Sequence, residues 1–468
     1  MRISDQTHLQ ATINDMLQFE DRLHQLSLKI YPSESLRDFV NGELLPILQN
    51  LREILLLEIK QLNEGNKQVV STEVKAVINF WWNEHLQFLA SKISSADLKS
   101  SPFELMEVFK NMISKIDNHE FEIITSPINV LNFTFQEIWQ PIKMVLENEI
   151  GISRYTNKKI IDLTFPNQHK DNIFLSGIFA HEIGHYFDRN KNIWSGVFTK
   201  IVQENHYIQD LKPFFHKPDG TPVTDAEVLT LLNQQILGSW IQEAVADCVA
   251  VHLLGPAFIF SSQELLISII GRLYVQTRHL LDMPSPTHPR SGLRLDFQIN
   301  TLKSLNLYDS LPSEVKTLLD TINNDWEQGT AYYTENILNA NTSNFLLNQH
   351  SYLIIEAIWK QCLPLVQSEV FDLIGENKMT ITHIEEAKLL ASEKIRWLVP
   401  PNEINGQIAS AQAIINSGWF AKLLYKDEIL SLVNRAEMPE SEYELTNLIN
   451  GLLKYALHAS HIQERWQK

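Results

Sequence analysis

The sequence predicts an α+β protein in which helices predominate and a small sheet lies between two helical regions. Leucine and isoleucine recur every three or four residues through residues 36–62 and 74–93, which is the period of an amphipathic helix. Three short runs, at 121–125, 130–135 and 159–165, are rich in β-branched and aromatic residues, a composition typical of strands. These patterns place the expected sheet after a helical N-terminal region.

The order of these elements, in a chain of 468 residues, predicts three regions. Residues 1–118 form an N-terminal helical region. Residues 119–310 hold the strands, a helix over 136–149 between the second and third of them, and further helices. Residues 311–468 form a C-terminal helical region with a break at Pro400-Pro401.

Two helices after the last strand are central to the second region. The first is capped by Asp171 or Asn172 and runs through Asp188. The second spans residues 239–254 and ends at Gly255-Pro256, because glycine favours the C-terminal end of a helix and proline cannot continue it.

Composition argues against several classes of protein. The chain carries 56 acidic and 39 basic residues, and its net charge of -17 disfavours binding to a nucleic acid backbone. It has two cysteines, Cys248 and Cys362, so a secreted disulfide scaffold is not expected. The N-terminus lacks the apolar core of a signal peptide, and no run reaches the roughly 18 apolar residues of a membrane span. We therefore expect a cytoplasmic protein without a membrane span.

The segment that carries chemistry is His-Glu-Ile-Gly-His at residues 181–185. Residues four apart on a helix lie one turn apart on the same face, so His181 and His185 can bind one metal ion. Glu182 projects beside the metal, where it can accept a proton from water as a general base. Apolar residues share the histidine face, so the imidazoles extend a buried stripe and need partners there.

Two histidines do not complete a catalytic zinc site, which usually has three protein ligands. The extended motif of the metzincins is excluded, because Asp188 replaces its glycine and Lys191 replaces its third histidine. Glu243, on the later helix, is the expected third ligand. Asp247 lies one turn further along the same helix face and is expected to accept the free ring N–H of a ligand histidine.

These residues resemble the gluzincin metallopeptidases, in which His-Glu-x-x-His is followed by Glu-x-x-x-Asp. Residues 155–300 look most like the family of CAAX prenyl proteases and membrane heat-shock proteases, which also has a later His-Pro followed by Arg, matched here by His288 and Arg294. The resemblance implies a zincin-like catalytic core made of a small sheet and the motif helix. It also implies that His288 and Arg294 line the cleft and steady a substrate or transition-state oxygen. The membrane helices of that family are missing from this sequence, so a prenylated or membrane substrate is not implied.

We therefore expect a single zinc ion per chain and hydrolysis of peptide bonds in a protein or peptide substrate, with Glu182 as general base. The strand at 159–165 is expected to be the sheet edge that pairs with an extended peptide. The main alternative is a latent or regulatory zinc-binding protein, whose cleft is blocked by the helical regions until a protein partner releases it. A second alternative is a helical scaffold that binds no metal.

Overall fold

The computed structural model is a predominantly helical α+β protein, which confirms the predicted fold class. The chain divides into two compact units, Met1–Lys170 and Asp171–Lys468. Neither predicted boundary, after residue 118 or after residue 310, coincides with this division, so the expected middle region contributes to both units. The structure describes residues 5–31, 33–64, 69–96, 102–130, 132–153, 158–203, 207–214, 221–277, 284–333, 349–433 and 441–467.

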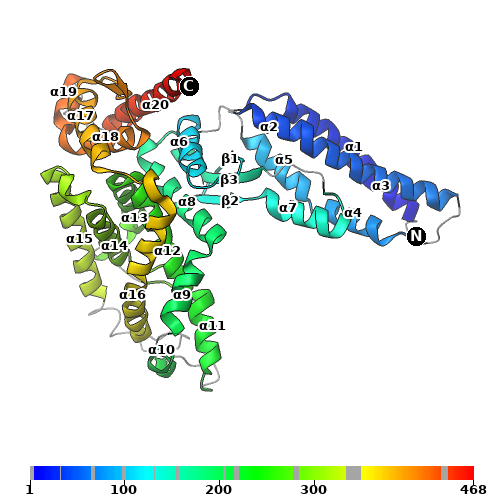
Figure 1. Ribbon diagram of the computed structural model, residues 1–468, viewed down its shortest axis with the longest axis horizontal. Coiled ribbons are helices and arrows are strands. Elements are labelled where there is room, and N and C mark those ends of the chain that lie inside the picture. Colours follow the sequence, from blue (N-terminus) through cyan, green and yellow to red (C-terminus); the bar gives the residue numbers. More distant parts are fainter. Residues whose placement is uncertain are drawn as a thin grey trace. The chain divides into compact units, whose positions relative to one another are not determined.

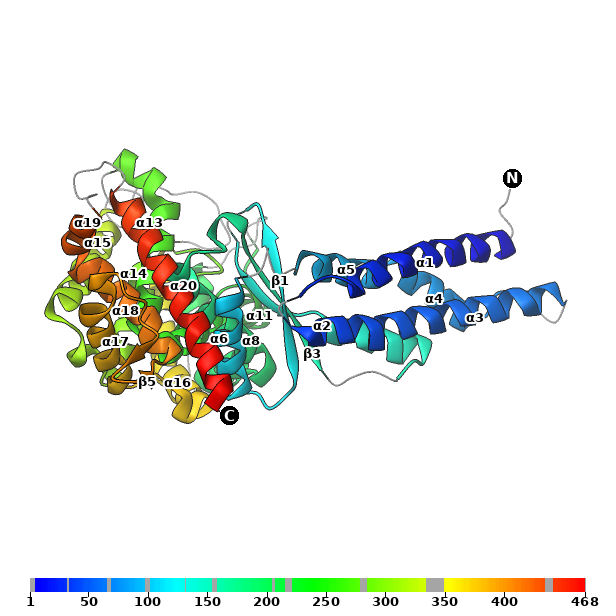
Figure 2. The same ribbon diagram turned by 90° about the horizontal axis from the view of Figure 1, so that it is seen from above.

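Helices of the first unit pack around an apolar core. Helices α1 and α3 pack against each other and lie side by side (Figure 2). Leu9 and Met16 of α1 and Leu48 and Leu55 of α3 are fully buried in this core, as expected for residues at helical spacing on one face. The helices of this unit are α1 (Asp5–Ser27), α2 (Glu34–Phe39), α3 (Leu45–Asn63), α4 (Thr72–Trp82), α5 (His85–Ser95), α6 (Phe103–Ser114) and α7 (Trp139–Val145).

Two of the predicted helical stretches depart from a single regular α-helix in ways that periodicity does not reveal. A π-helical turn, Val40–Leu44, joins α2 to α3, so residues 36–62 stay helical throughout. Residues 74–93 form two helices, because Glu84 adopts a left-handed backbone with φ 58° between α4 and α5. Neither glycine nor proline marks this break, and the apolar spacing continues across it.

The sheet of the first unit contains three strands, β1 (Phe121–Ile128), β2 (Thr134–Glu137) and β3 (Lys159–Pro166). The first and third match their predictions, whereas β2 begins four residues later than predicted and ends within the stretch expected to be helical. Their order is β1-β3-β2, with β3 parallel to β1 and antiparallel to β2. The prediction that residues 159–165 form the edge that receives a peptide is therefore wrong, since both sides of β3 are already hydrogen-bonded. Every residue of β3 after Lys159 is buried, which suits a central strand.

The second unit is a helical assembly around α12 (Figure 1). After α17 the chain also forms a short hairpin, β4 (Glu403–Ile404) and β5 (Gln407–Ile408), which the helical pattern of the C-terminal region did not predict. The helices of this unit are α8 (Ser176–Lys191), α9 (Ile193–Gln203), α10 (Tyr207–Leu211), α11 (Asp225–Gln235), α12 (Leu237–Leu254), α13 (Pro256–Thr277), α14 (Ser291–Ser304), α15 (Ser313–Tyr333), α16 (Gln349–Ile374), α17 (Ile381–Glu393), α18 (Ala411–Leu424), α19 (Lys426–Leu432) and α20 (Ser441–Gln467).

Helix α12 is buried on all sides. Of its residues only Ser239 and Gln242 are partly exposed. It packs against α8, α9, α13, α14 and α16, as expected for a helix that is apolar around its whole circumference. Charged side chains on this helix, such as Glu243, are therefore held inside the unit and need partners there.

Helices α8 and α12 approach each other closely at Gly184. A Cβ atom at this position would lie 2.5 Å from Ala246 Cα and 2.8 Å from the Ala246 carbonyl oxygen. Any side chain would collide with backbone that cannot rotate away. This glycine therefore fixes the separation of the two helices on which the predicted ligands lie.

The described part of the chain holds no helix that combines the length and the apolar composition needed to cross a lipid bilayer.

We predict that Gly184→Ala lowers the free energy of unfolding by about 1–3 kcal/mol, as overpacking of a close contact usually does. This loss should appear even though alanine is intrinsically the better helix former, by up to about 1 kcal/mol. The matched control is Gly196→Ala on α9, where no atom lies within 4 Å of the added methyl group, and which should leave stability unchanged or raise it slightly. Denaturant unfolding of both variants measures the difference, and equal effects would contradict the packing argument.

Candidate metal centre

The His-Glu-x-x-His segment lies on α8, as predicted, and its three polar side chains converge. The rings of His181 and His185 are nearly perpendicular, with centroids 4.7 Å apart. One possible ligand atom from each of His181, Glu182 and His185 lies within 4.8 Å of the other two. The one-turn spacing of the histidines thus brings two imidazoles and a carboxylate to the same side of the helix.

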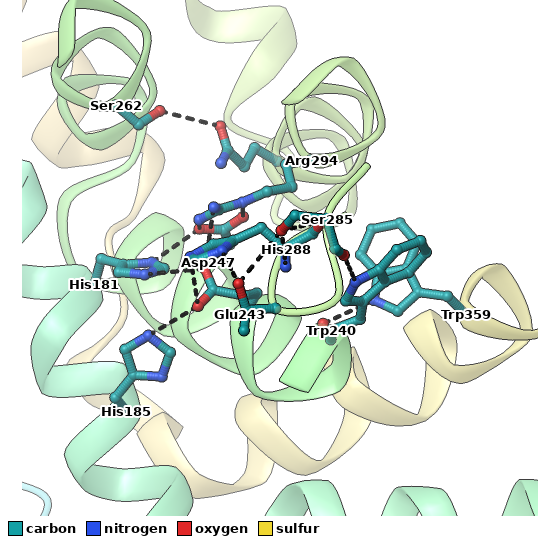
Figure 3. Close-up of polar contacts among 12 residues, drawn as sticks. His181, His185, Trp240, Glu243, Asp247, Ser262, Ser285, His288, Arg294 and Trp359 are labelled. Carbon is teal, nitrogen blue, oxygen red and sulfur yellow. Dashed lines mark hydrogen bonds and ion pairs between the residues drawn. The ribbon is translucent and has the colours of Figure 1, made fainter. Parts of the chain in front are cut away.

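Glu243 reaches the same point from α12 (Figure 3). His181 Nε2 lies 3.4 Å from Glu243 Oε2, and His185 Nε2 lies 3.4 Å from Glu243 Oε1. Ligands held about 2.0–2.2 Å from a tetrahedral zinc ion are separated from each other by about 3.3–3.6 Å. Each of these two nitrogen–oxygen distances matches that separation, and each involves a different oxygen of Glu243.

Asp247 lies behind His181, on the side away from Glu243. His181 Nδ1 is 2.9 Å from Asp247 Oδ1, and Asp247 is completely buried. Burial alone would lower the pKa of His181, but Asp247 and Glu243 outweigh it and raise this pKa to about 10. The two carboxylates therefore strongly favour a positive charge at His181.

Arg294, from α14, balances the two buried carboxylates. Its Nε and Nη2 atoms donate to Asp247 Oδ2 and Oδ1 at 2.8 and 2.7 Å, and its Nη1 lies 3.0 Å from Glu243 Oε2. Burial alone would raise the pKa of both acids, but Arg294 lowers that of Asp247 to about 2 and keeps that of Glu243 well below its usual value. The resemblance implies that Arg294 lines the cleft; in the structure its guanidinium contacts these two carboxylates, and its side chain is 12% exposed.

His288 is more accessible than the other residues of the cluster. Its side chain is 54% exposed, and its Nε2 lies 3.5 Å from Glu243 Oε1. Burial of the ring lowers its pKa, although the Glu243 carboxylate acts in the opposite direction. The structure thus brings His288 to the exposed side of the ligand cluster, where a substrate could contact it.

Sequence reasoning did not identify the residues that hold the turn carrying His288. Trp240 Nε1 donates to the Ser285 carbonyl at 2.9 Å, and Trp359 Nε1 of α16 donates to the Trp240 carbonyl at 2.8 Å. Trp240 lies one turn before Glu243 on α12. This position was the one feature of the sequence that could have linked Trp240 to the site. Trp359 lies 119 residues further along the chain and has no local pattern that links it to the site.

A second anchor is the paired contact between Arg290 and Glu356. Arg290 Nε and Nη2 donate to Glu356 Oε1 and Oε2 at 2.7 and 2.6 Å, and both side chains are largely buried. Two parallel hydrogen bonds fix orientation as well as distance. Helix α16, which was predicted only as part of a flanking helical region, therefore supports the site directly.

Glu182 differs from Glu243 in the direction in which its pKa is shifted. Its side chain is partly exposed, and burial raises its pKa, an effect that the neighbouring histidines reduce. Asp188, one turn after His185, is buried, and burial raises its pKa to about 6 although it accepts the Trp194 N–H at 2.8 Å. The two acids of α8, Glu182 and Asp188, are thus easier to protonate than Glu243 and Asp247 of α12.

Comparisons of the chain with protein-family models, with curated proteins and with solved structures found no match.

We predict that Arg294→Met lowers the free energy of unfolding by about 3–5 kcal/mol, because it leaves two buried carboxylates without their counter-ion. The comparison is Arg37→Met on α2, whose ion pair with Glu34 is exposed and should change stability by no more than about 0.5 kcal/mol. Unfolding should be followed with a chelator present, so that no metal ion replaces the lost charge. A small loss for Arg294→Met would show that the carboxylates find another partner.

Proposed function

We propose that this protein is a zinc-dependent endopeptidase that hydrolyses peptide bonds of a protein or peptide substrate. The observation that carries the proposal is the meeting of His181 Nε2 and His185 Nε2 with the two oxygens of Glu243, each at 3.4 Å. Two imidazoles and one carboxylate are the protein ligands of a common type of catalytic zinc site, which leaves the fourth position open.

The charge distribution supports a cation at this point. Glu243 and Asp247 are buried and ionised, and Arg294 supplies one positive charge against their two negative charges. A divalent ion between the imidazoles and Glu243 would supply the positive charge that is still needed. Its ligands would be nitrogen and oxygen atoms, which suit zinc. Asp247 would keep His181 in the tautomer whose free Nε2 points toward the ion.

Zinc bound there would acidify a water molecule and polarise a substrate carbonyl. Glu182 is the residue best suited to move protons in this reaction. Its carboxylate lies within 4.8 Å of the ligand atoms of both histidines, and its partial burial raises its pKa toward the range in which a general base works well. It would accept a proton from the attacking water and pass it to the leaving amine.

His288 is the residue best placed to stabilise negative charge on the substrate oxygen. It is exposed and reaches the ligand cluster from a different segment, so a carbonyl could lie between it and the zinc ligands. Arg294 would act indirectly, by holding Glu243 and Asp247 in place. In this proposal the arginine is a positioning residue.

The choice of peptide bonds as substrate depends on the resemblance to the gluzincins. The order His181, Glu182, His185, Glu243 and Asp247 follows the pattern of that class, and each of these side chains takes part in one cluster. The ligand set and the general base support hydrolysis of an acyl bond. The resemblance indicates that this bond is a peptide bond.

We predict that Glu182→Gln retains zinc but lowers kcat by about 10²- to 10⁴-fold, because the amide cannot accept a proton. The assay is cleavage of a mixed peptide library followed by mass spectrometry, run beside elemental analysis of each variant. Glu376→Gln, which alters an exposed acid of the same unit, should cleave like the wild type. Wild-type turnover by Glu182→Gln would reject this role for Glu182.

A further inference from the structure

The turn that carries His288 is fixed by its own polar groups as well as by its anchors (Figure 3). The Ser285 N–H donates to the His288 carbonyl at 2.9 Å, and Ser285 Oγ accepts the His288 N–H at 2.9 Å. Pro286 and Pro289 further restrict the backbone on either side, since proline fixes φ. Both the N–H and the carbonyl group of the His288 backbone are therefore held by hydrogen bonds.

The imidazole of His288 lies between two different kinds of partner. Its Nδ1 is 2.8 Å from Thr287 Oγ1, and its Nε2 is 3.5 Å from Glu243 Oε1. A carboxylate that is ionised can only accept hydrogen bonds, whereas a hydroxyl can donate or accept. A neutral imidazole carries one proton, so the proton belongs on Nε2 and the Thr287 hydroxyl donates to Nδ1.

The Ser285 hydroxyl lies next to this pair. Its Oγ lies 3.3 Å from Thr287 Oγ1. Because Thr287 uses its own proton on His288, its oxygen is free to accept from the Ser285 hydroxyl. Hydrogen bonds that run in one direction through such a chain reinforce each other. In this arrangement Thr287 donates to His288 and His288 donates toward the ligand cluster, while the Ser285 hydroxyl has two acceptors within reach, Thr287 Oγ1 and the His288 carbonyl oxygen at 3.4 Å.

We propose that Thr287 is a positioning residue that holds His288 as the tautomer with its proton on Nε2, so that this N–H faces the site and donates to a substrate oxygen. The inference rests on the proposed function for the identity of that oxygen. The tautomer itself is a property of the turn, and it can be measured without any substrate. No other described side chain is in hydrogen-bonding contact with the Nδ1 atom of His288.

The test compares Thr287→Val, which removes the hydroxyl at nearly constant shape, with Thr287→Ser, which restores it. Both changes are at an exposed position, so the fold should survive them. In protein labelled with ¹⁵N-histidine, long-range ¹⁵N–¹H spectra distinguish the two tautomers, and His288→Gln assigns the signal. We expect the Nε2–H pattern in the wild type and in Thr287→Ser, and a mixture of tautomers in Thr287→Val.

Kinetics supply the second measurement. Thr287→Val should lower kcat by about 3- to 10-fold, the effect of one neutral hydrogen bond, with KM and zinc content unchanged and with recovery in Thr287→Ser. An Nδ1–H pattern in the wild type, or no difference between the variants, would overturn the inference even if the protein cleaves peptides. If the tautomer shifts as expected but the wild type cleaves no peptide, the proposed function fails, and with it the role of His288 toward substrate.

Discussion

Helices α8 and α12 touch at Gly184 so closely that a single methyl group would collide with the backbone of Ala246. The rest of the candidate site depends on this contact. His181 and His185 extend from one helix and Glu243 from the other, and their side chains are too short to meet across a wider gap. Because α12 is buried on all sides, its acids have little contact with bulk water and must interact with partners inside the unit. Close packing thus determines both the distances between the candidate ligands and their electrostatic environment.

That environment consists of a small number of strongly coupled charges. Asp247 and Glu243 share Arg294, and both also face His181. Removing one partner from such a group leaves a buried charge without a counter-ion in surroundings of low dielectric constant. The loss of stability is then far greater than when a surface ion pair is removed. Arg294 contacts both carboxylates, while His181, His185 and His288 each lie next to Glu243. Support for the cluster therefore comes from α14, and support for the His288 turn comes from α16.

Much of this arrangement could be predicted from sequence, because it follows from local spacing. Helical periodicity places His181 beside His185, and the same rule places Glu243 beside Asp247. The contact between the two helices depends on the small residues Gly184 and Ala246. The anchors of the turn could not be predicted, since Arg290 and Glu356 are 66 residues apart and no local pattern links them. The prediction that residues 159–165 form a sheet edge was wrong for a similar reason. The sequence of a strand indicates whether the strand is buried, but its neighbours in the sheet are determined by the whole fold.

The central claim is that these residues bind zinc, and the most direct test is the metal content of the purified protein. The account predicts about one zinc ion per chain in the wild type, its loss in His181→Ala, and full retention in His24→Ala, which removes an exposed histidine of α1. Elemental analysis after incubation with zinc and removal of the unbound metal gives these values. A wild type without zinc, or a His181→Ala variant that keeps it, would contradict the account.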